Sequence, residues 1–226
     1  MSKHIGMYTR IMIPVFCLTI SAITTFSCQA GEKIRVGIFQ DSRDVAVPEI
    51  SRALEEKGMT VRVFNSRDVS QGKIYDCDVL FFGGGWTSYD WLDLPGRMRL
   101  AEYVETRGGG VIFSMFRCGW AARSGIRPIF PEIAQAYNKS NGPGIIVSDQ
   151  THPVMKGLPE CFMTPYYDHA VMRMGPQGRI LAVDTNGDVA IACGESGKGR
   201  VVFLGPWIGL NAEGRAAYPL PPHDER

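Results

Sequence analysis

The sequence has 226 residues, of which 45% are apolar and 21% charged, and its formal net charge is +1. These values are typical of a globular protein and exclude a disordered chain, and the length is enough for one α/β domain with a large core. Lys and Arg form no run or stripe, so we expect no nucleic-acid partner.

The first thirty residues have the layout of a secretory signal peptide. Lys3 and Arg10 precede an apolar run over residues 11–23, and small and polar residues then lead to Ala30. The run is shorter than the ~20 residues that a membrane span needs, so we expect no span; a buried N-terminal helix is the alternative reading. Cleavage after Ala30 predicts an exported protein, periplasmic or secreted. Lipidation at Cys28 would instead make it a lipoprotein.

Four cysteines remain after residues 1–30 are removed: Cys77, Cys118, Cys161 and Cys193. Export permits disulfides, and three pairings are open, as are four free thiols. No pair has the Cys-x-x-Cys spacing of a metal site. A site built on His152 and His169 would need a carboxylate to converge with both, so we expect no metal, and we expect no cofactor.

The first half of the mature chain predicts alternating strands and helices, which is typical of an α/β fold with parallel strands. Val47, Ile50 and Leu54 are spaced for one apolar helix face, and Leu94, Met98, Ala101 and Val104 are spaced for another that packs on the sheet. We expect strands over residues 33–39, 60–64, 79–82 and 111–116, and helices over about 45–57 and 94–104.

The second half is less regular. Residues 127–141 are rich in polar residues and predict a helical turn plus a loop, whereas short strands are expected over 145–147, 180–183, 189–193 and 201–204. We predict one domain over residues 31–215. Residues 216–226, which are rich in proline and charge, predict a disordered tail.

The run over residues 111–116 predicts a strand buried on both faces, and the residues that follow it are the first place to look for a site. Arg117, Cys118 and Trp120 stand where this strand is expected to end, and ligands bind at that edge of an open α/β sheet. The preceding strand leads into three glycines, followed by Trp86 and Tyr89. No Gly-x-Gly-x-x-Gly opens a helix there, so we expect no nucleotide site.

Four segments together resemble the class I glutamine amidotransferase-like fold, and within it the trehalose-utilisation (ThuA-like) proteins. They are residues 78–85, 108–112, 152–159 and 197–202. The resemblance implies a flavodoxin-like three-layer sandwich with a mostly parallel central sheet.

In that superfamily a cysteine on a sharp turn after the central strand attacks the substrate, with a His-x-Glu pair later in the chain supplying the base. The resemblance places this nucleophile position near Met115, and Met has no ionisable thiol. No His-x-Glu follows the last strand, where residues 205–208 read Gly-Pro-Trp-Ile. The resemblance therefore implies that glutaminase activity is lost. It also implies a link to carbohydrate metabolism.

Two hypotheses follow, and we favour the first. In the first, the chain is a pseudoenzyme: a non-catalytic binding or assembly domain for a small sugar-like ligand. Its oligomeric state stays open, and a homo-oligomer is one possibility. Alternatively, it is a hydrolase or isomerase acting on a sugar derivative, with Asp168 and His169 as acid and base and Arg117 as electrostatic stabiliser.

Aromatic faces suit the C–H side of a sugar, while charged groups bind its hydroxyls. The candidate ligand-binding residues are Trp86, Tyr89, Cys118 and Trp120. Against this stand plainer readings, in which Trp86 and Trp120 are core or lid residues and Cys118 is a packed thiol.

Overall fold

The structure is a computed structural model that describes residues 33–40, 47–84, 92–123, 130–140, 144–164, 166 and 168–208. The predicted leader, residues 1–30, and the predicted tail, residues 216–226, lie outside the described residues.

The first half of the described chain forms a parallel sheet with helical connections, as the sequence predicts. Strand β1 pairs in parallel with β2 and β3, β3 pairs with β4, and β4 pairs with β11. The elements are β1 (Arg35–Phe39), α2 (Val47–Glu56), β2 (Thr60–Phe64), α3 (Ser66–Ser70), a 3-10 helix (Lys73–Asp76), β3 (Val79–Phe82), α4 (Leu94–Glu105), β4 (Gly110–Ser114) and α5 (Phe116–Arg123).

The second half is antiparallel, so the expectation of a mostly parallel sheet was too broad. Strands β10 and β11 pair antiparallel, and so do β9 with β10, β6 with β9, β6 with β7 and β5 with β8. Short connections join β9 to β10 and β10 to β11, and a short connection suits antiparallel neighbours, whereas a parallel pair needs a longer crossover. The elements are β5 (Ile133–Ser140), β6 (Gly144–Val147), a 3-10 helix (Pro153–Met155), β7 (Cys161–Met163), β8 (Asp168–Met174), β9 (Arg179–Asp184), β10 (Val189–Ser196) and β11 (Gly199–Leu204).

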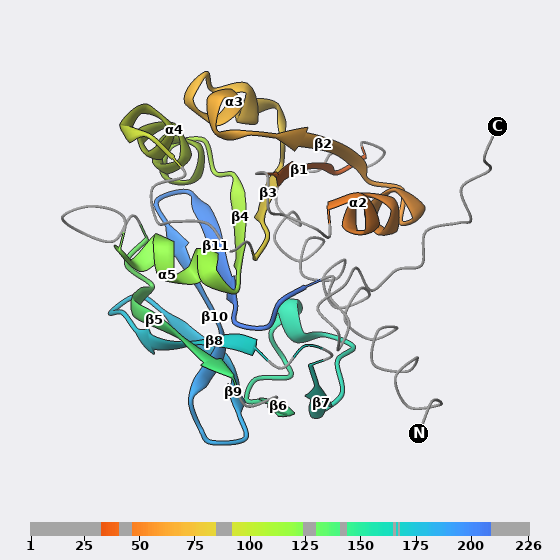
Figure 1. The fold of residues 1–226 in the computed structure, drawn as a ribbon, viewed down its shortest axis with the longest axis vertical. Helices are drawn as coiled ribbons and strands as arrows, with labels where there is room; N and C mark the ends of the chain where they lie inside the picture. Colours follow the sequence, from red (N-terminus) through yellow and green to blue (C-terminus); the bar gives the residue numbers. More distant parts are fainter. Residues whose placement is uncertain are drawn as a thin grey trace.

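One mixed sheet therefore runs through the molecule in the order β2-β1-β3-β4-β11-β10-β9-β6-β7, with β8 joined to β10 and β5 joined to β8. Figure 1 shows α2 on one side of the parallel strands and α3 with α4 on the other. The central strand β4 is buried along its whole length. The ends of β3, β4 and β11 thus meet in the middle of the molecule.

The helices pack partly as predicted. In α2 the expected face, Val47, Ile50 and Leu54, is buried. In α4 the predicted face was only partly right: Val104 is buried, but Leu94 and Met98 are 69% and 64% exposed. The buried face of α4 instead contains Gly96, Leu100, Tyr103 and Val104. On this buried face, the Tyr103 hydroxyl donates to the carbonyl oxygen of Cys77, just before β3, at 3.1 Å.

Two further expectations fail in the region after β4. The strand ends at Ser114 rather than at Phe116, so Arg117, Cys118 and Trp120 lie in helix α5. Residues 133–140, expected as part of a loop, form strand β5. The partner strand β8 was not predicted. Together β5 and β8 cover α5 on the side away from the parallel strands (Figure 1).

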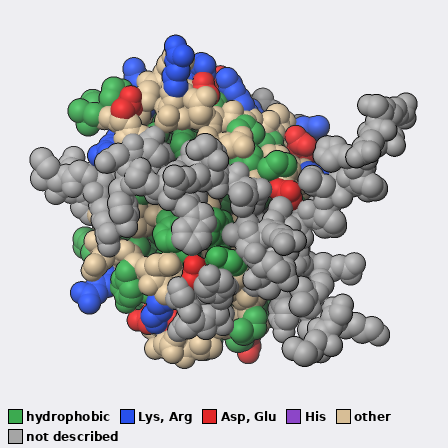
Figure 2. All heavy atoms as spheres, viewed as in Figure 1, with side chains coloured by type: hydrophobic (Ala, Val, Ile, Leu, Met, Phe, Trp, Pro, Cys, Tyr) green, Lys and Arg blue, Asp and Glu red, His purple; other side chains and the backbone are tan. Residues whose placement is uncertain are grey.

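No helix within the described residues is long and apolar enough to cross a membrane. Cys77, Cys118, Cys161 and Cys193 are all free thiols. On the face drawn in Figure 2, Lys and Arg side chains are spread around the rim with Asp and Glu among them, rather than gathered in one patch.

Candidate functional site

The connection between β4 and α5 is a sharp, strained turn centred on Met115. Met115 has φ = 50°, and it is the one residue other than glycine with positive φ among the described residues. A long side chain in the left-handed region costs of order 1 kcal/mol or more, and such strain gathers at functional sites. The turn is fixed from both sides, because the Met115 N–H donates to the Leu204 carbonyl oxygen at 2.9 Å and the Met115 carbonyl oxygen accepts from the Cys118 N–H at 3.0 Å. This turn is the elbow of the fold.

The ends of the neighbouring strands close around the elbow. Gly84, which follows β3, leaves no room for a side chain, since a Cβ there would lie 2.8 Å from Met115 Cβ. Trp207, which follows β11, is buried and packs edge-on against the rings of Phe116 and Tyr166 at 5.9 and 5.5 Å. The strand ends that the sequence singled out therefore converge on one point.

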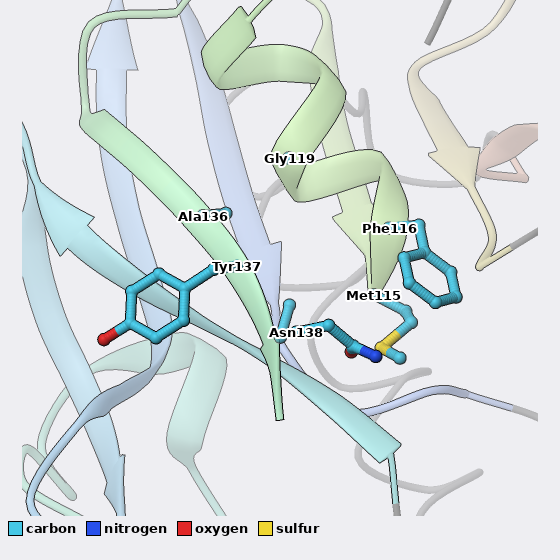
Figure 3. Close-up of a pocket in the computed structure, with 7 residues that line it drawn as sticks. Met115, Phe116, Gly119, Ala136, Tyr137 and Asn138 are labelled. Carbon is cyan, nitrogen blue, oxygen red and sulfur yellow. The ribbon is translucent and has the colours of Figure 1, made fainter. Parts of the chain in front are cut away.

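A pocket of about 120 Å³ lies beside the elbow, under strands β5 and β8. Figure 3 shows the Met115 and Asn138 side chains pointing toward one another, whereas the Tyr137 ring points away. The lining residues are Met115, Phe116, Gly119, Ala136, Tyr137, Asn138 and Ala170. The wall is mostly apolar, with the Asn138 carboxamide as the polar group that faces Met115.

Cys118 does not replace the missing nucleophile. Its side chain is fully buried, and its Sγ donates to the carbonyl oxygens of Phe113 and Leu204, each at 3.6 Å. Burial raises the pKa of this thiol far above its ordinary value of 9.0. A thiol attacks as the thiolate, so Cys118 is a packed core residue.

Arg117 and Trp120 are buried, and neither is among the residues that line the pocket. The Arg117 Nε–H donates to the Gly83 carbonyl oxygen at 3.2 Å, and its guanidinium carbon lies 5.4 Å from the centre of the Phe39 ring. Trp120 packs against Phe113 with ring centroids 6.1 Å apart, in agreement with its reading as a core residue. Arg117 therefore braces the ends of β1 and β3 next to the elbow rather than lining the pocket.

The structure does not bring Asp168 and His169 together as an acid–base pair. They are consecutive residues of β8, and successive side chains on a strand point to opposite faces. Asp168 shares its face with Ala170, which lines the pocket. His169 lies on the other face, and its backbone bridges to Pro206.

The partner of His169 is Asp184, at the end of β9. His169 Nε2 lies 3.4 Å from Asp184 Oδ2, and both side chains are fully buried. Lys139 Nζ donates to the same carboxylate oxygen at 3.2 Å and also to Asp188. The Asn186 and Asp188 N–H groups donate to the other oxygen at 2.8 and 3.0 Å.

Burial by itself raises the pKa of Asp184, but these hydrogen bonds outweigh it and lower the pKa to about 2. His169 thus belongs to an ionic cluster with Lys139, Asp184 and Asp188, in which Lys139 and Asp188 are partly exposed. This cluster lies on the face of β8 that is turned away from the pocket.

The other histidine considered from the sequence belongs to a separate pair. His152 Nε2 lies 3.7 Å from Cys193 Sγ, while its Nδ1 accepts from the Val154 N–H at 3.3 Å. Burial lowers the pKa of His152 and raises the pKa of Cys193 to about 11, so both groups are neutral near pH 7. Within the described ranges, no three His, Cys, Asp or Glu side chains are grouped to hold a metal ion.

Trp86 and Tyr89 lie outside the described residues. Sequence reasoning missed Asn138 and Ala170, because neither residue was expected on a strand. Trp207 was visible in the sequence as part of the segment that stands in place of His-x-Glu, but its packing against Phe116 was not foreseen.

Three solved structures are similar to this chain in fold. A candidate GMP synthase subunit from Thermoplasma acidophilum is 12% identical, with a TM-score of 0.55 over 75% of this chain and 82% of that one. A glutamine amidotransferase from Thermotoga maritima is 11% identical, with a TM-score of 0.50 over 76% of this chain and 75% of that one. The fold is that of the glutamine amidotransferase-like proteins.

An exo-β-1,4-mannosidase from an Opitutaceae bacterium is also similar, at 12% identity and a TM-score of 0.50. The match covers 77% of this chain but 31% of that enzyme, so it corresponds to part of a longer protein. At these identities the similarity concerns the amidotransferase-like fold alone. No family model matches the sequence, and no curated protein matches it.

Proposed function

We propose that this protein is an exported, non-catalytic binding domain on the amidotransferase-like fold, and that its ligand belongs to carbohydrate metabolism. The observation that carries the proposal is Met115, a residue with no ionisable thiol, in a strained turn. The resemblance to amidotransferases puts their cysteine near this position. The strain is retained while the attacking group is missing. This favours a pocket kept for binding rather than for acyl transfer.

The surroundings of the elbow agree with this proposal. The nearest thiol, Cys118, is fully buried and faces the sheet. The resemblance implies a histidine base after the last strand, where this sequence reads Pro206-Trp207, and the Trp207 ring packs edge-on against Phe116. A general base needs to lie within hydrogen-bond reach of its proton, and neither residue can accept one there.

The carbohydrate link rests on two likenesses, the resemblance to trehalose-utilisation proteins and the fold shared with part of a mannosidase. The pocket limits the size of the ligand. A volume of about 120 Å³ is below the roughly 300–1,000 Å³ of typical small-molecule sites, so it suits a single sugar ring or one end of a longer ligand. Export rests on the leader-like residues 1–30.

The test combines a glutaminase assay with a saccharide panel on the purified full chain. We expect no ammonia release from glutamine, and a rise in Tm with at least one monosaccharide, because ligand at 100 times Kd stabilises the fold by roughly 2.7 kcal/mol. Product analysis by mass spectrometry runs alongside. Conversion of a sugar derivative would favour the hydrolase or isomerase alternative, and ammonia release would overturn the loss of glutaminase activity.

Export is tested separately by expressing the chain with and without residues 1–30 in a bacterial host and fractionating the cells. We expect the chain expressed with residues 1–30 to reach the periplasmic or membrane fraction and to have lost about the length of the leader there. Recovery of an unprocessed chain in the cytoplasm would contradict the proposal of export.

A further inference from the structure

The inner part of the pocket beside the elbow is hollow because the residues around it are small. Gly119 on α5, Ala136 on β5 and Ala170 on β8 all line the pocket, and all three are buried. None of them has a side chain that can form a hydrogen bond. The inner part of the pocket therefore suits an apolar group, because a polar group there would lose its hydrogen bonds to water.

Gly119 is a residue of this set that the packing of the fold does not explain. It lies inside α5, where glycine is less favourable than alanine. Its φ is not among the positive values that the described glycines adopt, and the nearest neighbour of a Cβ there would be the Ala136 carbonyl oxygen at 3.8 Å. Neither backbone conformation nor a close contact thus requires glycine. What its missing side chain provides is space in the pocket.

The mouth of the pocket carries the polar group. Asn138 lies two residues after Ala136 on the same face of β5, and it is exposed whereas Ala136 is buried. Its side chain points toward Met115 (Figure 3). A carboxamide offers both a donor and an acceptor and carries no charge, so it matches a ligand group that also offers both. An amide is such a group.

The order of these features along the pocket decides how a sugar would enter. A ring placed inside would bury several hydroxyls with the Asn138 carboxamide as their polar partner, and the unpaired hydroxyls would oppose binding. A substituent that is apolar at its tip and has an amide next to the tip meets the small residues first and Asn138 second.

We infer that the elbow pocket binds an N-acetylated sugar through its acetamido group. The methyl group packs on Gly119, Ala136 and Ala170, and the amide pairs with the Asn138 carboxamide at the mouth. The sugar ring stays outside, with its C–H side on the half-buried Phe116 ring. This inference rests on the proposed binding function and names the part of the ligand that the pocket recognises.

Three sugars that differ at one substituent test the inference: N-acetyl-D-glucosamine, N-formyl-D-glucosamine and D-glucose. By isothermal titration calorimetry on the full chain, we expect the N-acetyl sugar to bind at least about tenfold more tightly than glucose, with the N-formyl sugar between them because it lacks the methyl group. Equal binding of all three would overturn the inference while leaving a sugar-binding function in place. Binding of none would overturn the inference, and the saccharide panel would then decide the carbohydrate proposal separately.

Gly119→Ala tests the inner part of the pocket, because the added methyl group takes the place of the ligand's methyl. We expect the affinity for N-acetyl-D-glucosamine to fall at least about fivefold through overpacking, while the Tm of the free protein stays equal or rises. An unchanged affinity would overturn the placement of the acetamido group.

Asn138→Leu tests the mouth, since it keeps a side chain of similar size and removes the carboxamide. We expect it to lose the preference for N-acetyl-D-glucosamine over glucose. Gln135→Leu is the matched control, because Gln135 is also an exposed carboxamide on β5 but does not line the pocket. It should keep the preference, and an equal loss in both variants would overturn the role of Asn138.

Discussion

A Cβ atom on Gly84 would lie 2.8 Å from the Cβ atom of Met115 and 2.9 Å from Trp207 Nε1. These atoms belong to three strand ends that meet at the elbow, so none of them can retreat easily. Gly84→Ala should therefore destabilise the fold by about 1–3 kcal/mol through overpacking, measured as a shift of the urea midpoint.

Gly119→Ala provides the matched comparison. A Cβ on Gly119 would have one neighbour within 4 Å, the Ala136 carbonyl oxygen at 3.8 Å, and the residue lies inside helix α5. We expect the stability to stay the same or to rise by up to about 1 kcal/mol, because alanine favours the helix. Equal shifts of the urea midpoint in the two variants would mean that close packing around the elbow does not cause the loss of stability in Gly84→Ala.

The cysteines should differ sharply in reactivity. Cys161 is exposed, whereas Cys118 is fully buried with its pKa raised by that burial. We expect iodoacetamide to label Cys161 in the native protein at pH 8 and to leave Cys118 unmodified until urea unfolds the chain. Peptide mass spectrometry measures both sites in one sample. Labelling of Cys118 in the native state would contradict its assignment to the core.

Glu132 should make the stability fall as the pH rises. Both of its carboxylate oxygens are buried without a hydrogen-bond partner among the described residues. Burial, and secondarily the charge of Glu105, raises the pKa of this carboxyl above its ordinary value of 4.5. The folded protein therefore holds a proton that the unfolded chain releases, and stability declines from pH 4.5 up to the raised folded pKa.

Glu132→Gln removes this titration. We expect the Tm of the variant relative to wild type to increase between pH 4 and pH 8, by the equivalent of about 1–3 kcal/mol. Glu195→Gln, at an exposed position on β10, is the control for the change in net charge. A constant difference for Glu132→Gln would show that its carboxyl is not titrating in this range.

Asp184 should act in the opposite direction at acid pH. Its pKa is lowered to about 2 from an ordinary 3.8, so its contribution is complete above pH 3.8 and disappears as the pH falls toward 2. Asp184→Asn breaks the buried contacts to Lys139 and His169 and should destabilise the fold at pH 7 by about 3 kcal/mol or more.

The partly exposed Asp188 gives the comparison for this cluster, because exposed ion pairs contribute at most about 1 kcal/mol. Asp188→Asn should therefore cost much less than Asp184→Asn in thermal denaturation at pH 7. A similar loss in both variants would mean that the cluster acts as one unit rather than through the buried carboxylate.

The parallel half of the fold was predictable because its strands are continuous apolar runs, and residues 79–82 form a strand with the bounds expected. Strand β5 was missed because its sequence, Ile-Ala-Gln-Ala-Tyr-Asn-Lys-Ser, mixes polar and apolar residues. It is a strand because β8 pairs with it, and that pairing depends on residues about 30 positions later. The α4 face was misjudged for a related reason, since Leu94 and Met98 match the helical period as well as Leu100 and Tyr103 do.

The candidate site also has a part that the sequence predicted and a part that it did not. The resemblance indicated the elbow at Met115, and the structure places it there. The roles given to Asp168 and His169 depended on their being neighbours in sequence, whereas the alternation of a strand separates them and pairs His169 with Asp184. A contact across 15 residues leaves no periodic pattern that a single sequence could reveal.

Among the described residues, β11 is the last strand along the chain, and it lies inside the sheet between β4 and β10. Until residues 199–204 have left the ribosome, β4 and β10 each present an unpaired edge, and the elbow lacks the Leu204 carbonyl oxygen that holds Met115. The sheet therefore cannot close around the elbow before residues 199–204 are available. During that interval the unpaired edge of β4 is open to aggregation.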